Sequence, residues 1–314
     1  MSKTTCAGFD AGVLRGMVAE SSYRLYQSYF MEYCEFAGDG ISALDHRTLS
    51  RWRQHLLGST YDTKSDERVY SVNSINNRLA AVKSIMKEAA NQGYMSAEEA
   101  IRFRLVRRLD KKVAKDRQMA NTVRLSRRDI QHICEQPDRQ TGAGKMNYAL
   151  LLTLATVGLR ASEAATLRYS QIEEAQNETG AGWVVYVMGK DQADEMPVAL
   201  SVAAKDAIDE WLTYRREKCG VDVDYIFTSF HGRGTRASDT PVTRAGVWHI
   251  VNRYAQMAGV ENVKPHDLRR YVGTQLAKNN IRLAQKQLRH SRIDTTVKFY
   301  VLDSVEIGSV DDLI

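Results

Sequence analysis

Two arginines and a histidine in the second half of the chain have the local setting of an anion-binding site. Arg160 follows Gly158, a residue that commonly ends a helix, and a guanidinium at the start of the next helix suits a bound anion. His266 and Arg269 follow a proline that suits a first helical turn, and their spacing places them on one face. Both patterns are common, and Arg160 with Glu163 nearby is typical of a structural ion pair. Together, the two patterns predict a clamp for a negatively charged group.

Three further side chains have chemistry that a phosphate-transfer reaction would use. Lys190 lies at the tip of an expected hairpin, where an ammonium can protonate a leaving oxygen, although most such lysines are merely exposed. His290 comes shortly after an expected helix, and Tyr300 is the only tyrosine after Tyr271. A phenol has a pKa of about 10 and is a weak nucleophile at neutral pH. Tyr300 would therefore need a proton acceptor and fixed positive charge nearby.

The order of these residues along the chain is more informative than any one of them. An arginine, a hairpin lysine, a His-x-x-Arg pair, a histidine and a tyrosine follow one another, within contexts that include Gly-Leu-Arg-x-Ser-Glu and His-Asp-Leu-Arg-Arg. This arrangement resembles the tyrosine recombinase (phage integrase) superfamily over nearly the whole chain, and in particular its two-domain Cre-like and Xer-like members. The resemblance implies a catalytic set of Arg160, Lys190, His266, Arg269, His290 and Tyr300.

The resemblance also implies a role for each member of the set. Tyr300 would attack a DNA phosphodiester and form a 3′-phosphotyrosyl link. Arg160 and Arg269 would hold the non-bridging oxygens, and Lys190 would protonate the leaving 5′-oxygen. Because the covalent link conserves the energy of the phosphodiester bond, we expect no ATP, no metal and no other cofactor. The sequence has neither a phosphate-binding glycine loop nor an acidic cluster typical of a two-metal site.

The two imidazoles complete the implied set, His266 as base or charge stabiliser and His290 as a hydrogen-bond partner of the scissile phosphate. The spacing departs from the family pattern at two places. It is slightly shorter from Arg269 to His290 and slightly longer from His290 to Tyr300. His249 is the other candidate imidazole, but it precedes the His-x-x-Arg pair and is interpreted as structural.

Positive charge is concentrated in one part of the chain. The 314 residues carry 44 Lys and Arg against 38 Asp and Glu, a net charge of +6. Residues 101–128 contain eleven Lys or Arg and two Asp, so this segment carries +9 and the rest of the chain −3. Such a segment is typical of a polyanion-binding protein, although a solvated helix face has the same composition. With the polar side of an expected helix, it predicts DNA contacts by Asn73, Asn76, Asn77, Arg78, Lys83, Arg107, Arg108, Lys111 and Lys112.

Apolar spacing predicts the elements that must position these side chains. Helical periodicity at residues 10–37 and 46–57, in a segment opening at 65–68, and from residue 96 predicts an all-α first half. Strand-like stretches at 183–188 and 196–200 predict one small hairpin in a mostly helical second half. Ser126 is the expected N-cap of its first helix. Further helices are expected at 149–157, 202–216, 244–258, 266–278 and 283–288.

The fold class is therefore mostly α, in two domains. We expect an N-terminal all-α domain at residues 1–105, a basic linker at 106–124 and a C-terminal α-rich domain with a small β-hairpin or sheet at 125–314. The resemblance implies that the first is a core-binding (SAM-like) DNA domain and the second is catalytic. No apolar run approaches the roughly 20 residues of a membrane span, and the N-terminus lacks a signal-peptide layout. The four cysteines have neither metal-site nor redox-pair spacing, so we expect reduced thiols.

These expectations describe a site-specific DNA recombinase that acts through a Holliday junction. Its partner would be double-stranded DNA with paired recognition sites, on which free monomers would form a homotetramer. The alternatives are a type IB topoisomerase-like DNA-relaxing enzyme, a hairpin telomere resolvase and a non-catalytic DNA-binding protein on the same fold. We expect a cytoplasmic, nucleoid-associated protein of bacterial, phage or plasmid origin. The sequence names neither the DNA target, the biological role nor any accessory protein.

Overall fold

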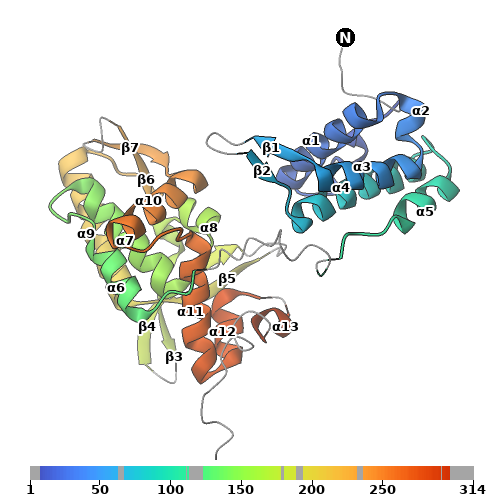
Figure 1. Cartoon of the computed structure of the whole chain (residues 1–314). Coiled ribbons are helices and arrows are strands. Elements are labelled where there is room, and N and C mark those ends of the chain that lie inside the picture. The colour runs from blue at the N-terminus through green and yellow to red at the C-terminus, as the bar shows by residue number, and fades with distance from the viewer. Residues whose placement is uncertain are drawn as a thin grey trace, which may run out of the picture. The chain divides into compact units, whose positions relative to one another are not determined.

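The chain divides into two compact units, Met1–Ala120 and Asn121–Ile314, shown in Figure 1. The computed structural model describes residues 8–62, 67–110, 112, 123–177, 180–188, 194–231, 236–290 and 292–297. Most of the basic segment expected at 106–124 lies outside these ranges. Within the described ranges, no helix is long and apolar enough to cross a membrane.

The first unit is a bundle of helices whose starts are set by short polar side chains. Asp39, Asp45, Ser71 and Ser96 each accept a hydrogen bond from a backbone N–H in the first turn of the helix they precede. The elements are η1 (Ala11–Leu14), α1 (Glu20–Ala37), α2 (Gly40–Ala43), α3 (His46–Gly58), β1 (Thr60–Asp62), β2 (Glu67–Val69), α4 (Val72–Asn91) and α5 (Ala97–Leu105).

The expectation of an all-α first unit is wrong in one place. Strands β1 and β2 form an antiparallel hairpin in which Thr60 pairs with Val69. Helix α4 begins at Val72 rather than at residues 65–68, because the hydroxyl of Ser71 caps it by accepting from the N–H of Ser74 at 3.1 Å. Strands of three residues are too short to show the alternation that identifies a strand in a sequence.

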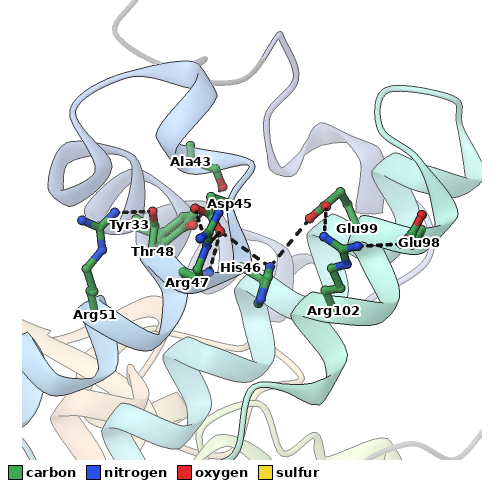
Figure 2. A network of polar contacts seen from close by, with 10 residues as sticks. All are labelled: Tyr33, Ala43, Asp45, His46, Arg47, Thr48, Arg51, Glu98, Glu99 and Arg102. Carbon is green, nitrogen blue, oxygen red and sulfur yellow. Dashed lines mark hydrogen bonds and ion pairs between the residues drawn. The ribbon is translucent and has the colours of Figure 1, made fainter.

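A polar network lies where α3 and α5 of the first unit meet. Figure 2 shows the network where α3 begins beside α5. The Nδ1 atom of His46 lies 3.6 Å from a carboxylate oxygen of Asp45 and 3.8 Å from one of Glu99. Arg102 extends the network by pairing with Glu99 at 3.0 Å and Glu98 at 2.6 Å. The Arg102 pairs lie within α5, and the approach of His46 to Glu99 is the contact in this network that joins α3 to α5, whose end leads into the basic segment.

The second unit is mostly helical with small antiparallel sheets, as the sequence predicted. The expectation of a single hairpin is wrong, because a third strand joins the first sheet in the order β3–β4–β5 and β6 pairs with β7. The elements are α6 (Arg127–Glu135), α7 (Gly142–Val157), α8 (Ala161–Ala165), η3 (Tyr169–Gln171), β3 (Ile172–Asn177), β4 (Gly180–Met188), β5 (Glu195–Leu200), α9 (Val202–Cys219), β6 (Thr228–His231), β7 (Arg236–Pro241), α10 (Arg244–Met257), α11 (Pro265–Asn279), α12 (Ile281–Leu288) and α13 (Ile293–Thr296).

Helix α7 forms the centre of the second unit. It is apolar on most sides, as with Leu150, Leu151 and Leu154, and packs against α6, α9 and α11. Ser126 caps α6 in a reciprocal capping box with Asp129, which confirms the predicted helix start.

The expectation of four reduced cysteines is wrong, since Cys134 and Cys219 are free thiols but Cys34 is disulfide-bonded.

Candidate active site

Gly158 brings the end of α7 against α11 and α12. Its φ of +75° is the left-handed conformation that favours glycine at a helix end. A Cβ atom at this residue would lie 2.9 Å from Leu288 Cδ2 and 3.3 Å from Val272 Cβ. Glycine therefore permits a close approach that a larger residue would obstruct. Two residues later, Arg160 occupies the N-cap of α8, so this turn places it beside the helices that carry the other candidate residues.

The carboxylate of Glu163 gathers three guanidiniums. It accepts from the backbone N–H of Arg160 at 2.7 Å and from the guanidinium of the same residue at 2.6 Å. Arg289, directly after α12, donates to Oε2 at 2.5 Å, and Nη1 of Arg269 on α11 lies 3.9 Å from that oxygen. Residues from three separate segments thus meet at one carboxylate, of which only 8% of the side chain is exposed.

The charge state of Glu163 follows from these neighbours. Burial by itself would raise its pKa, but the positive charge of Arg289 and the hydrogen bonds from Arg160 outweigh burial, and the pKa is lowered. The carboxylate is therefore ionised at neutral pH. A buried anion that accepts this many hydrogen bonds has a fixed orientation, which it passes on to the arginines.

Two backbone carbonyls hold the guanidinium of Arg269 in place. Its residue surface is 1% exposed, and its guanidinium donates to the carbonyl of Gly158 at 2.6 Å and to that of Leu288. On the same helical turn, the buried carboxylate of Asp267 accepts from the backbone N–H of Lys264 at 2.8 Å. Burial raises the pKa of Asp267. This residue caps α11 and so sets the helix that carries Arg269.

His266 lies in the first turn of α11, on its exposed side. Partial loss of hydration lowers its pKa, and the positive charge of Arg269 acts in the same direction. Arg160 and Arg270 lower the pKa further, whereas Asp267 opposes them. The imidazole is therefore mainly neutral at pH 7 and can accept a proton.

His290 lies at the same focus of positive charge. Burial lowers its pKa to about 4, together with the positive charge of its neighbours Arg269, Arg160, His266 and Arg289. The structure therefore brings together four of the six residues predicted as catalytic, although they are far apart along the chain. Among the described residues, no group of three or more His, Cys, Asp or Glu is arranged to hold a metal ion.

The orientation of His290 depends on α13. Its Nδ1 atom lies 3.0 Å from the hydroxyl oxygen of the buried Thr296. If this nitrogen accepts the Thr296 proton, the other ring nitrogen carries hydrogen and is a hydrogen-bond donor. The predicted nucleophile Tyr300 and the predicted acid Lys190 lie outside the described residues. The other candidate imidazole, His249, is exposed on α10 and packs against Trp248.

Gln287 links strand β5 to α7 and α12. These helices adjoin the arginine cluster, which is the group of Arg160, Arg269 and Arg289 around Glu163. Its side-chain amide donates to the carbonyl of Ala199 at 2.9 Å and accepts from the N–H of Ala199 at 3.0 Å. The same amide donates to the carbonyl of Val157 at 3.1 Å. Strand β5 is therefore tied to the end of α7 and to α12. Lys190 is in the connection between β4 and β5, so the hydrogen bonds of Gln287 hold the strand that directly follows the Lys190 segment.

The sequence indicated Glu163 only as a partner of Arg160 in a structural ion pair, and it gave no indication of a role for Arg289, Gln287 or Thr296. Arg289 stands beside His290 in a segment that the sequence singled out, yet adjacency gave no indication of burial. Gln287 and Thr296 are polar residues near the ends of short helices, where solvent exposure is the ordinary expectation. Only their packing separates them from surface residues.

Three of the side chains on α4 that were predicted to contact DNA have partners within the first unit. Asn76 donates to the carbonyl of Leu109 at 3.0 Å and accepts from its N–H at 2.9 Å. Arg78 forms a bidentate pair with Glu32 at 2.7 and 3.2 Å. Lys83 donates to the backbone carbonyl of Arg104, in the last turn of α5, and to that of Val106, directly after the helix. These contacts stabilise the first unit, and a role in DNA contact stays a prediction for each.

The other predicted DNA contacts are on the surface where the structure describes them. An exposed amide or cation is available to a phosphate, but exposure alone does not distinguish a contact from a solvated side chain. Lys111 lies outside the described residues. The exposed members are Asn73, Asn77, Arg107, Arg108 and Lys112.

The sequence also matches a known family. The model of the phage integrase family matches residues 123–306, which is more than half of the chain. A tyrosine recombinase of Synechococcus elongatus is 28% identical over 233 residues, covering 72% of this chain and 66% of that protein. Tyrosine recombinase XerD of Listeria monocytogenes is 25% identical over 292 residues, covering 90% of this chain and 88% of its own length. For XerD of Lacticaseibacillus casei the match spans 60% of the relative.

Solved structures share the fold. The XerH recombinase in a post-cleavage complex with its palindromic difH substrate superimposes with a TM-score of 0.65 at 18% identity, covering 90% of this chain and 76% of that one. A lambda integrase fragment on a core site gives 0.63 at 12% identity, covering 95% and 94%. The chain belongs to the phage integrase family, and the relatives described above are named tyrosine recombinases. The resemblance predicted from the order of motifs is confirmed.

Proposed function

We propose that this chain cuts and rejoins double-stranded DNA at specific sites through a 3′-phosphotyrosyl intermediate on Tyr300. The observation that carries the proposal is the convergence of Arg160, Arg269, His266 and His290 around one focus of positive charge. Positive charge that is already fixed in place stabilises a pentavalent phosphorus without reorganisation during the reaction. Membership of the phage integrase family supports the same chemistry.

In the proposed cleavage step, the Tyr300 oxygen attacks the scissile phosphorus and the bond from phosphorus to the 5′-oxygen breaks. The phenol proton passes to His266, which is mainly neutral at pH 7 because its pKa is lowered. Lys190 gives a proton to the leaving 5′-oxygen. The phosphoryl group remains esterified to Tyr300 and to the 3′ end, so a 5′-hydroxyl of the partner strand can attack it, form a new phosphodiester bond and release Tyr300 without ATP.

The scissile phosphate would be held from two sides. Arg160 has 32% of its side chain exposed, so it can present N–H groups to an entering phosphate while Glu163 holds the rest of the guanidinium. Arg269 would supply charge from the interior of the site. His290 would donate one hydrogen bond from the nitrogen that faces away from Thr296.

The rest of the chain would deliver DNA to this site. We assign residues 1–105 to a core-binding domain, 106–124 to a basic linker and 125–314 to a catalytic domain. Four copies would assemble on paired sites and exchange strands through a Holliday junction, with the chain monomeric when free. Such a protein works where the DNA is, in the cytoplasm of a bacterial cell and on its nucleoid.

Covalent trapping on a suicide substrate tests the proposal. We expect wild-type protein to form a covalent adduct with DNA and Tyr300→Phe to bind the same DNA without forming one. Lys190→Ala should cleave slowly on normal DNA and at close to the wild-type rate when sulfur replaces the bridging 5′-oxygen, because a thiolate leaves without an acid. Adducts that persist in Tyr300→Phe would refute the assignment of the nucleophile. Relaxation of supercoiled DNA by monomers, without strand exchange, would identify a topoisomerase instead.

A further inference from the structure

Arg289 adopts a backbone conformation that arginine rarely takes. It is the C-cap of α12 with φ +52° and ψ +45°, and only Asn262 among the other non-glycine residues that the structure describes has a positive φ. Glycine is the usual residue for this conformation at a helix end, because a β-carbon is disfavoured there. An arginine at this place suggests that its side chain has a role which glycine could not supply.

The side chain of Arg289 is buried completely and points toward the arginine cluster. None of its side-chain surface is exposed, and Nη2 donates to Oε2 of Glu163 at 2.5 Å. Nη1 lies 3.4 Å from the carbonyl oxygen of Gln287, and Nε–H has no partner among the described residues. A buried guanidinium must be paired, and Glu163 is the carboxylate that pairs it.

The two carboxylate oxygens of Glu163 accept hydrogen bonds from different donors. Oε2 accepts from Arg289 and from the backbone N–H of Arg160, while Oε1 accepts from the Arg160 guanidinium at 2.6 Å. Because Arg289 is buried and cannot move aside, it fixes Oε2 and thereby the direction in which Oε1 points. Arg160 is the more exposed partner, so its guanidinium takes its orientation from the carboxylate.

We propose that Arg289 is a positioning residue for DNA cleavage, which anchors Glu163 so that the Arg160 guanidinium is aimed at the scissile phosphate. This inference rests on the proposed function. A purely structural role would give a different result, since removing Arg289 would then lower stability and leave the cleavage rate of the folded protein unchanged.

Arg289→Gly is the most informative variant, because glycine favours the observed backbone conformation. We expect it to bind DNA within about threefold of wild type and to cleave a phosphodiester about 100-fold more slowly in single turnover at saturating protein. On a substrate with a methylphosphonate at the scissile position the deficit should fall below about tenfold, because the neutral group depends less on an aimed guanidinium. The control is Arg216→Ala, which removes an arginine on α9 that is 64% exposed and should cleave both substrates at the wild-type rate.

Two results would overturn the inference. One is a folded Arg289→Gly protein that cleaves the phosphodiester at the wild-type rate, and the other is an equal deficit on both substrates. If Arg289→Gly does not fold, Arg289→Lys performs the same test, because its ammonium keeps the charge but lacks the planar fork. We expect at least fivefold slower cleavage of the phosphodiester by Arg289→Lys, and a wild-type rate would refute the role. Failure of the proposed function is a separate outcome, in which wild-type protein itself forms no adduct.

Discussion

Replacing Gln287 by leucine tests how the sheet is coupled to the arginine cluster. The amide makes three hydrogen bonds, at 2.9 and 3.0 Å to Ala199 and at 3.1 Å to Val157, and the residue is only 8% exposed. A typical hydrogen bond contributes about 1 kcal/mol net, so the three together contribute about 3 kcal/mol. Leucine has a similar size and recovers part of this through apolar contact. We therefore expect Gln287→Leu to lower the free energy of unfolding by about 2–3 kcal/mol.

Two measurements together check this expectation. Urea unfolding of the full chain gives the loss of stability, and amide hydrogen exchange gives the protection of the Ala199 N–H, which should fall by more than about tenfold. Gln131→Leu on α6 is the matched control, because Gln131 is exposed and the same substitution there should change stability by less than about 0.5 kcal/mol.

The reasoning would be refuted if Gln287→Leu unfolded like wild type and kept the protection of Ala199. That result would mean that β5 is held by its pairing with β4 alone. Because β5 follows the connection that contains Lys190, a loosened strand should also slow cleavage on normal DNA. Cleavage of a substrate with bridging sulfur should be less affected, since that reaction needs no acid.

Two further substitutions probe the packing and the charge of the site. Gly158→Ala should destabilise the protein by about 2 kcal/mol, since the positive φ costs about 1 kcal/mol and Leu288, 2.9 Å from the new Cβ, must move; urea unfolding measures this, and unchanged stability would contradict it. Lower pH should also destabilise the fold, because the His290 pKa of about 4 lies below its unfolded value of 6.5 and the unfolded chain takes up protons first. The stability from His290 is present above pH 6.5 and should fall by about 2 kcal/mol by pH 5, with the lowered pKa of His266 acting in the same direction. Urea midpoints at pH 7.5 and 5 check this, and His290→Gln with an undiminished pH dependence would show that another group is responsible.

The sequence by itself determined the features that depend on near neighbours. Ser126 and Ser96 mark helix starts because their hydroxyls bond to an N–H three residues later. Gly158 marks a helix end because of its own backbone freedom. The reactive side chains were identified in the same way, since their type, order and local context are properties of the chain and need no knowledge of packing.

Only the tertiary structure decided which of these side chains share an environment and what supports them. Strand β3 (Ile172–Asn177) is mostly polar, so it has no clear periodicity, and pairing with β4 makes it a strand. Arg289 and Glu163 are 126 residues apart, and Gln287 and Ala199 are 88 apart. A polar side chain has the same composition whether it faces water or a buried carboxylate. Whether such a side chain is exposed or buried depends on the packing of helices that are far apart in the sequence, because packing removes the water around it. A local sequence pattern does not predict this packing.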